Sequence, residues 1–216
     1  MDNLATFSII IGIYGAYLVG MFHFRSASSE GGHRPLPVAT FVLFALVAIP
    51  STLQFFFPVF LPLFERDRAQ ILAGEPWRLL TALCFQDGGL TGGIFNLVNL
   101  GLIGSLAERA WGPWRLLLFF LLGGLLSEII ALSWQPVGAG NSIANFSIAG
   151  GLIVWCLASR PRLSFLLLCL PCLGAYLALL TLRDIHGAAA LIGLLLGLGL
   201  LWLDRQRIAQ TRQAEK

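Results

Sequence analysis

Charged residues are scarce in this sequence of 216 residues. Asp, Glu, Lys and Arg together make up 12% of it, about half of their usual share in a soluble domain, while 57% of the residues are hydrophobic. This balance excludes an ordinary soluble domain. The net charge of +3 comes from basic residues that are scattered in ones and twos, so it does not indicate a nucleic-acid partner.

Cysteine is rare as well, and its positions exclude an extracellular disulfide framework. All four cysteines stand in apolar surroundings, at positions 84, 156, 169 and 172. Cys169 and Cys172 have the C-x-x-C spacing, which leaves two alternatives, a redox pair or two buried thiols that fill space. We favour buried thiols, because no polar segment that would be exposed to water flanks the pair.

In place of charge, the sequence has a succession of long apolar segments. A helix of about 20 apolar residues is long enough to cross a bilayer. Segments of this kind lie at about residues 4–22, 38–57, 93–106, 116–134, 142–158, 163–180 and 185–203. The sequence therefore predicts an all-α, polytopic membrane protein. Residues 65–78 are expected at the membrane interface, and the charged tail 204–216 as the solvated end of the last helix.

The basic residues predict the topology. Arg25 and Arg34 follow the first segment and none precedes it, which argues for a retained helix with an outer N-terminus and against a cleaved signal peptide. Four of the 14 basic residues fall in one set of alternate loops (Arg66, Arg68, Arg78 and Arg183), and ten fall in the other. The richer set places the C-terminus in the cytoplasm. We expect a bacterial inner membrane as the host.

A glycine-rich loop at residues 137–141 leads into the fifth apolar segment and places Ser142 in the first turn of a helix. At that position a hydroxyl can cap the helix, and free N–H groups beside it can receive an anion. His186, the one histidine inside the long apolar segments, stands 44 residues later and at the same membrane side. Small residues on both helices, including Gly150 and Gly193, allow a close approach. These features predict a Ser142–His186 dyad; the alternative is a helix cap and a structural histidine.

Three other polar residues of the apolar segments are open to more than one interpretation. Ser147 is a weaker nucleophile candidate, because five helical residues turn it about 140° away from Ser142. Asn96 could donate to an oxyanion or pin two helices together. Glu128 could be a protonated acid with a hydrogen-bond partner or a gate residue.

Taken in order, the motifs resemble those of the rhomboid intramembrane serine proteases. The resemblance rests on residues 75–81, Asn96, residues 104–108 with Gly112, residues 140–142 with Phe146 and Gly150, and residues 184–186 with Gly193. It covers about residues 38–203 and implies a six-helix core. The first segment is then an extra N-terminal helix, which gives predicted units at 1–36, 37–203 and 204–216.

The resemblance also implies roles for individual residues. Ser142 is the expected nucleophile and His186 the general base, and Asn96 with the backbone N–H of Ser142 is expected to stabilise the oxyanion. Trp77 and Arg78 would lie in the membrane-embedded loop of the fold. Glu108, Gly150 and Gly193 complete the structural motif. The expected substrates are transmembrane helices with a destabilised stretch of small residues near the outer face. The expected partners are these proteins and the lipid bilayer, with no metal, cofactor or nucleic acid.

The sequence departs from the family pattern beside the serine. Gly92 stands four residues before Asn96, where the family usually has a histidine, and Ile143 replaces the usual glycine after the serine. Losing one oxyanion donor costs about 10²-fold or more in rate, and Asn141 or Asn145 is expected as an auxiliary donor. The main alternative function is therefore an inactive rhomboid-like pseudoprotease that binds or escorts transmembrane helices. A transporter is the third reading, disfavoured by the lack of an inverted repeat.

Overall fold

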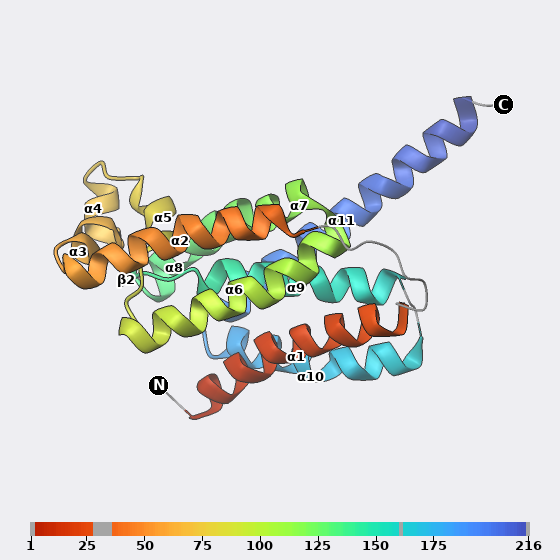
Figure 1. Cartoon of the computed structure of the whole chain (residues 1–216), viewed down its shortest axis with the longest axis horizontal. Helices are drawn as coiled ribbons and strands as arrows, with labels where there is room; N and C mark the ends of the chain where they lie inside the picture. Colours follow the sequence, from red (N-terminus) through yellow and green to blue (C-terminus); the bar gives the residue numbers. More distant parts are fainter. Residues whose placement is uncertain (1–2, 28–35, 160–161, 215–216) are drawn as a thin grey trace.

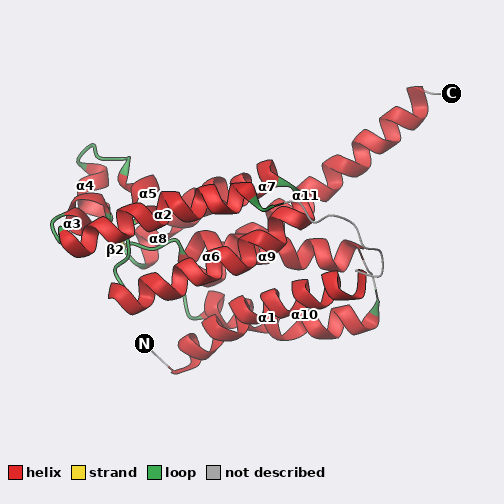
Figure 2. Cartoon of the chain, in the orientation of Figure 1, coloured by secondary structure: helices red, strands yellow, loops and turns green. Residues whose placement is uncertain are grey.

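A computed structural model describes residues 3–27, 36–159 and 162–214 of the chain. It confirms the prediction of an all-α, multi-pass membrane protein, because its described part contains seven helices that are long and apolar enough to cross a membrane (Figures 1 and 2). These spans are α1 (Asn3–Ala27), α2 (Val38–Phe56), α6 (Gly89–Trp111), the run of α7 (Pro113–Leu118), η2 (Phe119–Gly123) and α8 (Gly124–Trp134), α9 (Ser142–Ser159), α10 (Leu163–Thr181) and α11 (Ile185–Ala214).

The third and fourth spans are separated by a helix stop followed at once by a helix start. Gly112 has a φ of +82°, a left-handed conformation that glycine adopts without steric cost, and it ends α6. Pro113 then occupies the first position of α7, where a missing N–H and a fixed φ favour the beginning of a helix. The fourth span changes to π-helical hydrogen bonding at η2 before it continues as α8. Gly112 and Pro113 are therefore sufficient to connect α6 with α7, without a longer loop.

Helix α9 forms the centre of the bundle, with most of its side chains buried. Helices α11, α6 and α1 pack against it. Helix α1 runs beside α10 (Figure 1), and the Tyr176 hydroxyl of α10 donates to the carbonyl of Gly12 at 3.0 Å. On its other side, the Tyr14 ring meets the Phe95 ring of α6 edge-on, with 5.9 Å between centroids. Helix α1 therefore lies between α6 and α10.

Short elements fill one end of the bundle, between α2 and α6. They are α3 (Phe60–Phe64), β1 (Arg66–Asp67), α4 (Arg68–Leu72), α5 (Arg78–Thr81) and the 3₁₀ turn η1 (Ala82–Cys84). Strand β1 pairs antiparallel with β2 (Val137–Gly138), so that Arg66 faces Gly138 and Asp67 faces Val137. This pairing ties the short elements to the loop that precedes Ser142.

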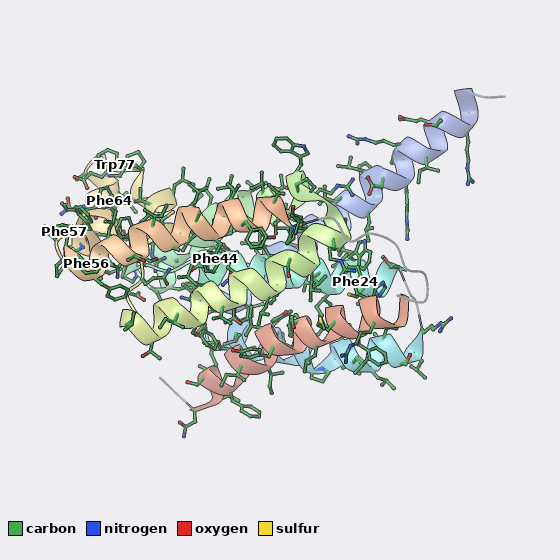
Figure 3. The ribbon with its side chains drawn as sticks, viewed as in Figure 1. Phe24, Phe44, Phe56, Phe57, Phe64 and Trp77 are labelled. Carbon is green, nitrogen blue, oxygen red and sulfur yellow. The ribbon has the colours of Figure 1, made fainter. Side chains whose placement is uncertain are left out.

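The side chains at this end fit a membrane interface. Phe56, Phe57, Phe64 and Trp77 gather there (Figure 3), and Trp77 is half exposed, as an interfacial tryptophan would be. The neighbouring Arg78 is buried instead. Its guanidinium donates to Glu75 Oε2 at 2.5 Å and to the carbonyls of Pro62 and Glu65 at 2.8 and 3.1 Å. Arg78 thus holds the end of α3 against α5.

The opposite end of the bundle is held by a carboxylate that caps a helix. Glu108 of α6 accepts from the backbone N–H groups of Ala39 and Thr40 at 3.0 and 2.7 Å, and from the Thr40 hydroxyl at 2.7 Å. These N–H groups belong to the first turn of α2, where no intrahelical acceptor exists. One acid therefore fixes the start of α2 to α6.

Helix α11 is longer than a bilayer requires. Its 30 residues span about 45 Å, against about 30 Å for the hydrocarbon core. Residues 205–213 are exposed and extend away from the other helices (Figure 1). The predicted tail is thus, as far as Ala214, a continuation of the last span.

Candidate active site

Ser142 and His186 meet at the end of the bundle where α9 and α11 begin. The hydroxyl oxygen of Ser142 lies 2.9 Å from Nε2 of His186, which is hydrogen-bonding distance. The ring of Phe146, one turn along α9, packs against the imidazole with 4.9 Å between ring centroids. The structure therefore brings together the two side chains that the sequence predicts as a dyad.

Glycines set the separation of the two helices. A Cβ atom added at Gly150 of α9 would lie 2.3 Å from the carbonyl oxygen of Ala190. One added at Gly193 of α11 would lie 2.0 Å from the carbonyl oxygen of Ser147. Both distances are too short for real atoms, so the two backbones are in direct contact at these glycines. The Ser142–His186 distance is thus determined by backbone packing.

Asp184 contacts the other nitrogen of the histidine. Its Oδ1 atom lies 2.6 Å from Nδ1 of His186 and accepts from the backbone N–H of the same residue at 2.9 Å. Burial alone would raise the pKa of Asp184, but the hydrogen bonds and charge of His186 lower this pKa below its usual range. In the sequence, Asp184 belongs to the motif at residues 184–186 but has no predicted role.

A network of side-chain amides surrounds Asn96. Its Nδ2 donates to Oε1 of Gln86 at 2.8 Å, and Nε2 of Gln86 donates to Oδ1 of Asn141 at 2.9 Å. Asn141 and Asn145 in turn donate to the carbonyl of Asn96, at 3.3 and 2.9 Å. The two asparagines expected as auxiliary oxyanion donors therefore bind the backbone of Asn96 in this structure. Gln54 fixes Gln86 through two bonds to its backbone, of 2.6 and 2.8 Å.

Gly140 adjoins the serine, and Gly92 leaves open space at the position four residues before Asn96. A Cβ atom added at Gly140 would lie 3.5 Å from both Asn96 Nδ2 and Ser142 Oγ, so these two polar atoms face the same point. A Cβ atom added at Gly92 would meet nothing within 4 Å. A substrate carbonyl near Gly140 would thus have a nucleophile and an amide donor beside it, whereas the position of Gly92 supplies no further donor.

A cavity of about 180 Å³ adjoins the dyad, and Gly140 is among the residues that line it. Ser142, Asp184 and His186 line it together with Arg66, Glu128 and other residues, among them Asp87 and Gln135. The guanidinium of Arg66 is bonded to Oε2 of Glu128, while Oε1 of Glu128 has no hydrogen-bond partner among the described residues. Glu128, which the sequence leaves as either a protonated acid with a hydrogen-bond partner or a gate residue, forms a buried pair with Arg66, and this contact does not decide between the two alternatives.

The remaining candidates lie away from the dyad. The hydroxyl of Ser147 points at Gly123 of η2, where an added Cβ would be 1.9 Å from it. Cys169 and Cys172 are buried free thiols on α10. Among residues 3–27, 36–159 and 162–214, no group of three or more His, Cys, Asp or Glu side chains could hold a metal ion.

Some of the site residues gave no usable signal in the sequence. Gln54 and Gln86 are ordinary glutamines, one in an apolar helix and one in a short loop, and their contact joins positions 32 residues apart. Asp184 did carry a signal, because an Asp directly before a helix caps it and His186 is the second residue of that helix. A capping Asp and a His two residues later place the carboxylate oxygen beside the imidazole, and this spacing predicts the contact between Asp184 and His186.

Comparison with known proteins adds two findings. The family profile of the Rhomboid domain matches residues 73–207, which is more than half of the chain. The "Rhomboid protease GluP" of Bacillus subtilis (strain 168) is 33% identical over 96 residues, which cover 44% of this chain and 19% of that protein. The matched part is therefore about a fifth of the length of this relative. The profile includes Ser142, His186 and Asn96 but neither α1 nor α2.

Proposed function

Because the chain belongs to the rhomboid family, we propose that it is an intramembrane serine protease that cleaves transmembrane helices with Ser142 as nucleophile and His186 as general base. At the level of the family, the Rhomboid domain and the GluP relative support intramembrane proteolysis. For this chain the observation that carries the proposal is the 2.9 Å contact between Ser142 Oγ and His186 Nε2. A hydroxyl at this distance from an imidazole nitrogen can lose its proton as it attacks.

The proposed reaction has two halves. In the first, Ser142 Oγ bonds to the scissile carbonyl carbon, its proton passes to His186 Nε2, and the carbonyl electron pair moves onto the oxygen. The C–N bond then breaks, the leaving amine takes the proton from Nε2, and an acyl enzyme remains. In the second half a water molecule gives a proton to Nε2 and bonds to the acyl carbon, and Ser142 leaves with that proton.

The oxyanion is stabilised by groups on two helices. The Nδ2 group of Asn96 faces the same point as Ser142 Oγ, next to Gly140. The backbone N–H of Ser142 lies in the first turn of α9, where N–H groups have no intrahelical acceptor. Asn141 and Asn145 contribute by holding the carbonyl of Asn96, which keeps its side chain aimed at the site.

The expected substrates follow from where the serine lies. Ser142 is at the end of α9, near the interface, and its cavity is lined by charged side chains. A peptide bond inside an intact helix is shielded by its own hydrogen bonds, so the substrate must unwind before attack. A transmembrane helix with a stretch of small residues near that interface unwinds most easily. The distribution of basic residues supports a cytoplasmic C-terminus and an outward-facing Ser142 in a bacterial inner membrane.

One observation favours a second function, that of a pseudoprotease which binds or escorts transmembrane helices. The space beside Gly92 is open, so the donor that the family usually supplies there is missing. The two functions differ in whether Ser142 reacts. A binder has no need of a hydroxyl activated by a histidine.

Labelling of Ser142 separates these functions. The purified protein in detergent is treated with a fluorescent fluorophosphonate, and the wild type is compared with Ser142→Ala and His186→Ala. Labelling that disappears in both variants is the expected result, because the probe needs the nucleophile and its base. Folded wild-type protein that takes up no label would refute the protease and support the pseudoprotease. Cleavage of transmembrane peptides in liposomes then identifies the substrate sequences.

A further inference from the structure

Asp184 occupies a turn that is fixed from both sides. Arg183, two residues beyond the end of α10, has a φ of 54°, in the left-handed region. The N–H groups of Arg183 and Asp184 donate to the carbonyls of Leu180 and Leu179 at 3.1 and 2.9 Å, which is the bond pattern of a Schellman helix end. The next residue begins α11. The backbone of Asp184 is therefore held by the end of one helix and the start of the next.

The carboxylate of Asp184 has two hydrogen-bond donors, and both belong to His186. Its Oδ1 accepts the backbone N–H of His186, as a helix-capping Asp does, and lies 2.6 Å from Nδ1 of the imidazole. An ionised carboxylate can only accept hydrogen bonds, so Nδ1 must carry a proton. In the neutral imidazole, Nε2 then has a free lone pair, and Nε2 is the atom beside the Ser142 hydroxyl.

The surroundings keep this carboxylate available to the histidine. The side chains of Asp184 and His186 are 12% and 16% exposed, so their contact is largely shielded from water. Other charged groups line the same cavity: Asp87 and the pair of Arg66 with Glu128. The guanidinium of Arg66 is bonded to Glu128 and to the Gln135 carbonyl. Asp184 Oδ1 forms its hydrogen bonds with the backbone N–H and Nδ1 of His186.

We propose that Asp184 is the positioning residue of the active site, a third member that fixes the tautomer and orientation of His186 so that Nε2 faces Ser142. This proposal rests on the proposed protease function and extends it from a dyad to a triad. Asp184 itself takes no proton. When Nε2 receives the proton of Ser142, Nδ1 keeps its own, and the carboxylate stabilises the resulting imidazolium. The same contact would orient the imidazole in an inactive protein, which gives a readout independent of catalysis.

The test combines that readout with reactivity. Asp184→Asn is the informative variant, because asparagine caps a helix as well as aspartate does while it removes the charge. Asp67→Asn is the matched control. Asp67 is a half-buried cap of α4 near the same interface, and its side chain accepts from the N–H groups of Ala69 and Gln70. Heat-induced unfolding confirms that both variants are folded.

The first measurement is ¹⁵N NMR of histidine-labelled protein in detergent, with the His186 signals assigned by their loss in His186→Ala. In the wild type and Asp67→Asn we expect a protonated Nδ1 and an unprotonated Nε2 above the pH at which the ring ionises. In Asp184→Asn we expect this preference to be lost. A wild-type ring protonated at Nε2, or a preference unchanged by Asp184→Asn, would overturn the proposal whether or not the protein is active.

The second measurement is the rate of labelling by the fluorophosphonate as its concentration is varied. We expect Asp184→Asn to lower the maximal rate by up to about 10⁴-fold, the effect of an amide in place of a triad carboxylate, with the half-saturating concentration little changed. An unchanged maximal rate would overturn the positioning role. Wild-type protein that is never labelled but has the expected tautomer would instead refute the protease function and leave the Asp184–His186 contact supported.

Discussion

The contact between α9 and α11 predicts a large effect of a single methyl group. In Gly193→Ala the new Cβ would lie 2.0 Å from the carbonyl oxygen of Ser147, and 2.7 and 2.8 Å from the carbonyl carbon and Cα of the same residue. All three neighbours are backbone atoms, so no side chain can rotate away. The two helices must separate by roughly 1 Å for the closest pair to reach a tolerable distance.

This separation acts on both stability and reactivity. Overpacking of a core costs about 1–3 kcal/mol, of which the better helix propensity of alanine returns up to about 1 kcal/mol. A shift of about 1 Å would also lengthen the 2.9 Å contact between Ser142 and His186 beyond hydrogen-bonding distance. Misplacement of this size costs about 10²-fold in rate. We therefore expect a lower unfolding temperature and labelling of Ser142 slowed by about that factor.

Gly199→Ala is the matched control, since it makes the same change on the same helix. A Cβ atom added at Gly199 would meet nothing within 4 Å, so this variant should unfold at or above the wild-type temperature and react normally. The assays are heat-induced unfolding in detergent and the rate of fluorophosphonate labelling per folded molecule. If Gly193→Ala unfolds and reacts like the wild type, the helix separation does not set the dyad geometry and the reasoning is wrong.

Two further predictions concern the buried ion pair and the topology. Arg66→Met leaves the fully buried carboxylate of Glu128 without its partner, so the free energy of unfolding should fall by about 3–5 kcal/mol. Adding Glu128→Leu to the same chain should restore much of this loss. A thermal midpoint unchanged by Arg66→Met would contradict the prediction. In the proposed orientation, in which the loops rich in basic residues lie in the cytoplasm, green fluorescent protein fused after Lys216 should fluoresce in cells and alkaline phosphatase fused there should be inactive. The reverse pattern would invert the proposed orientation.

The sequence alone predicted the spans and the meeting of Ser142 with His186, and both rest on local signals. Apolar length is read directly from the chain, and each of the two residues lies at the start of a span on the same side. The chain crosses the membrane twice between Ser142 and His186, so both residues were expected at the same end of the bundle. Small residues such as Gly150 and Gly193 then indicated that the two helices touch, as they do.

The sequence could not predict the contacts that are made by irregular loops and short elements, because the course of such segments leaves no periodic pattern of residues. Glu128 was recognisable as an acid in an apolar segment, but its partner Arg66 stands 62 residues earlier, in an interfacial segment that only the β1–β2 pairing brings close. The amide network has the same origin. Gln86 reaches Asn96 and Asn141 because the turn before α6 is hydrogen-bonded, through Asp87, to Ala139 of the loop that leads to Ser142. No repeat or composition marks such a turn.

Helix α1 stands close to His186 although the Rhomboid profile does not include this helix. Gly12 is so near to Phe146 that an added Cβ would lie 3.0 Å from that ring, and Phe146 packs on His186. Since α1 also contacts both α6 and α10, it forms a wall between them. A helix that diffuses in the plane of the bilayer meets this wall before it can reach the site from that side. Under the proposed protease function, a substrate helix that approaches His186 from that side must displace α1.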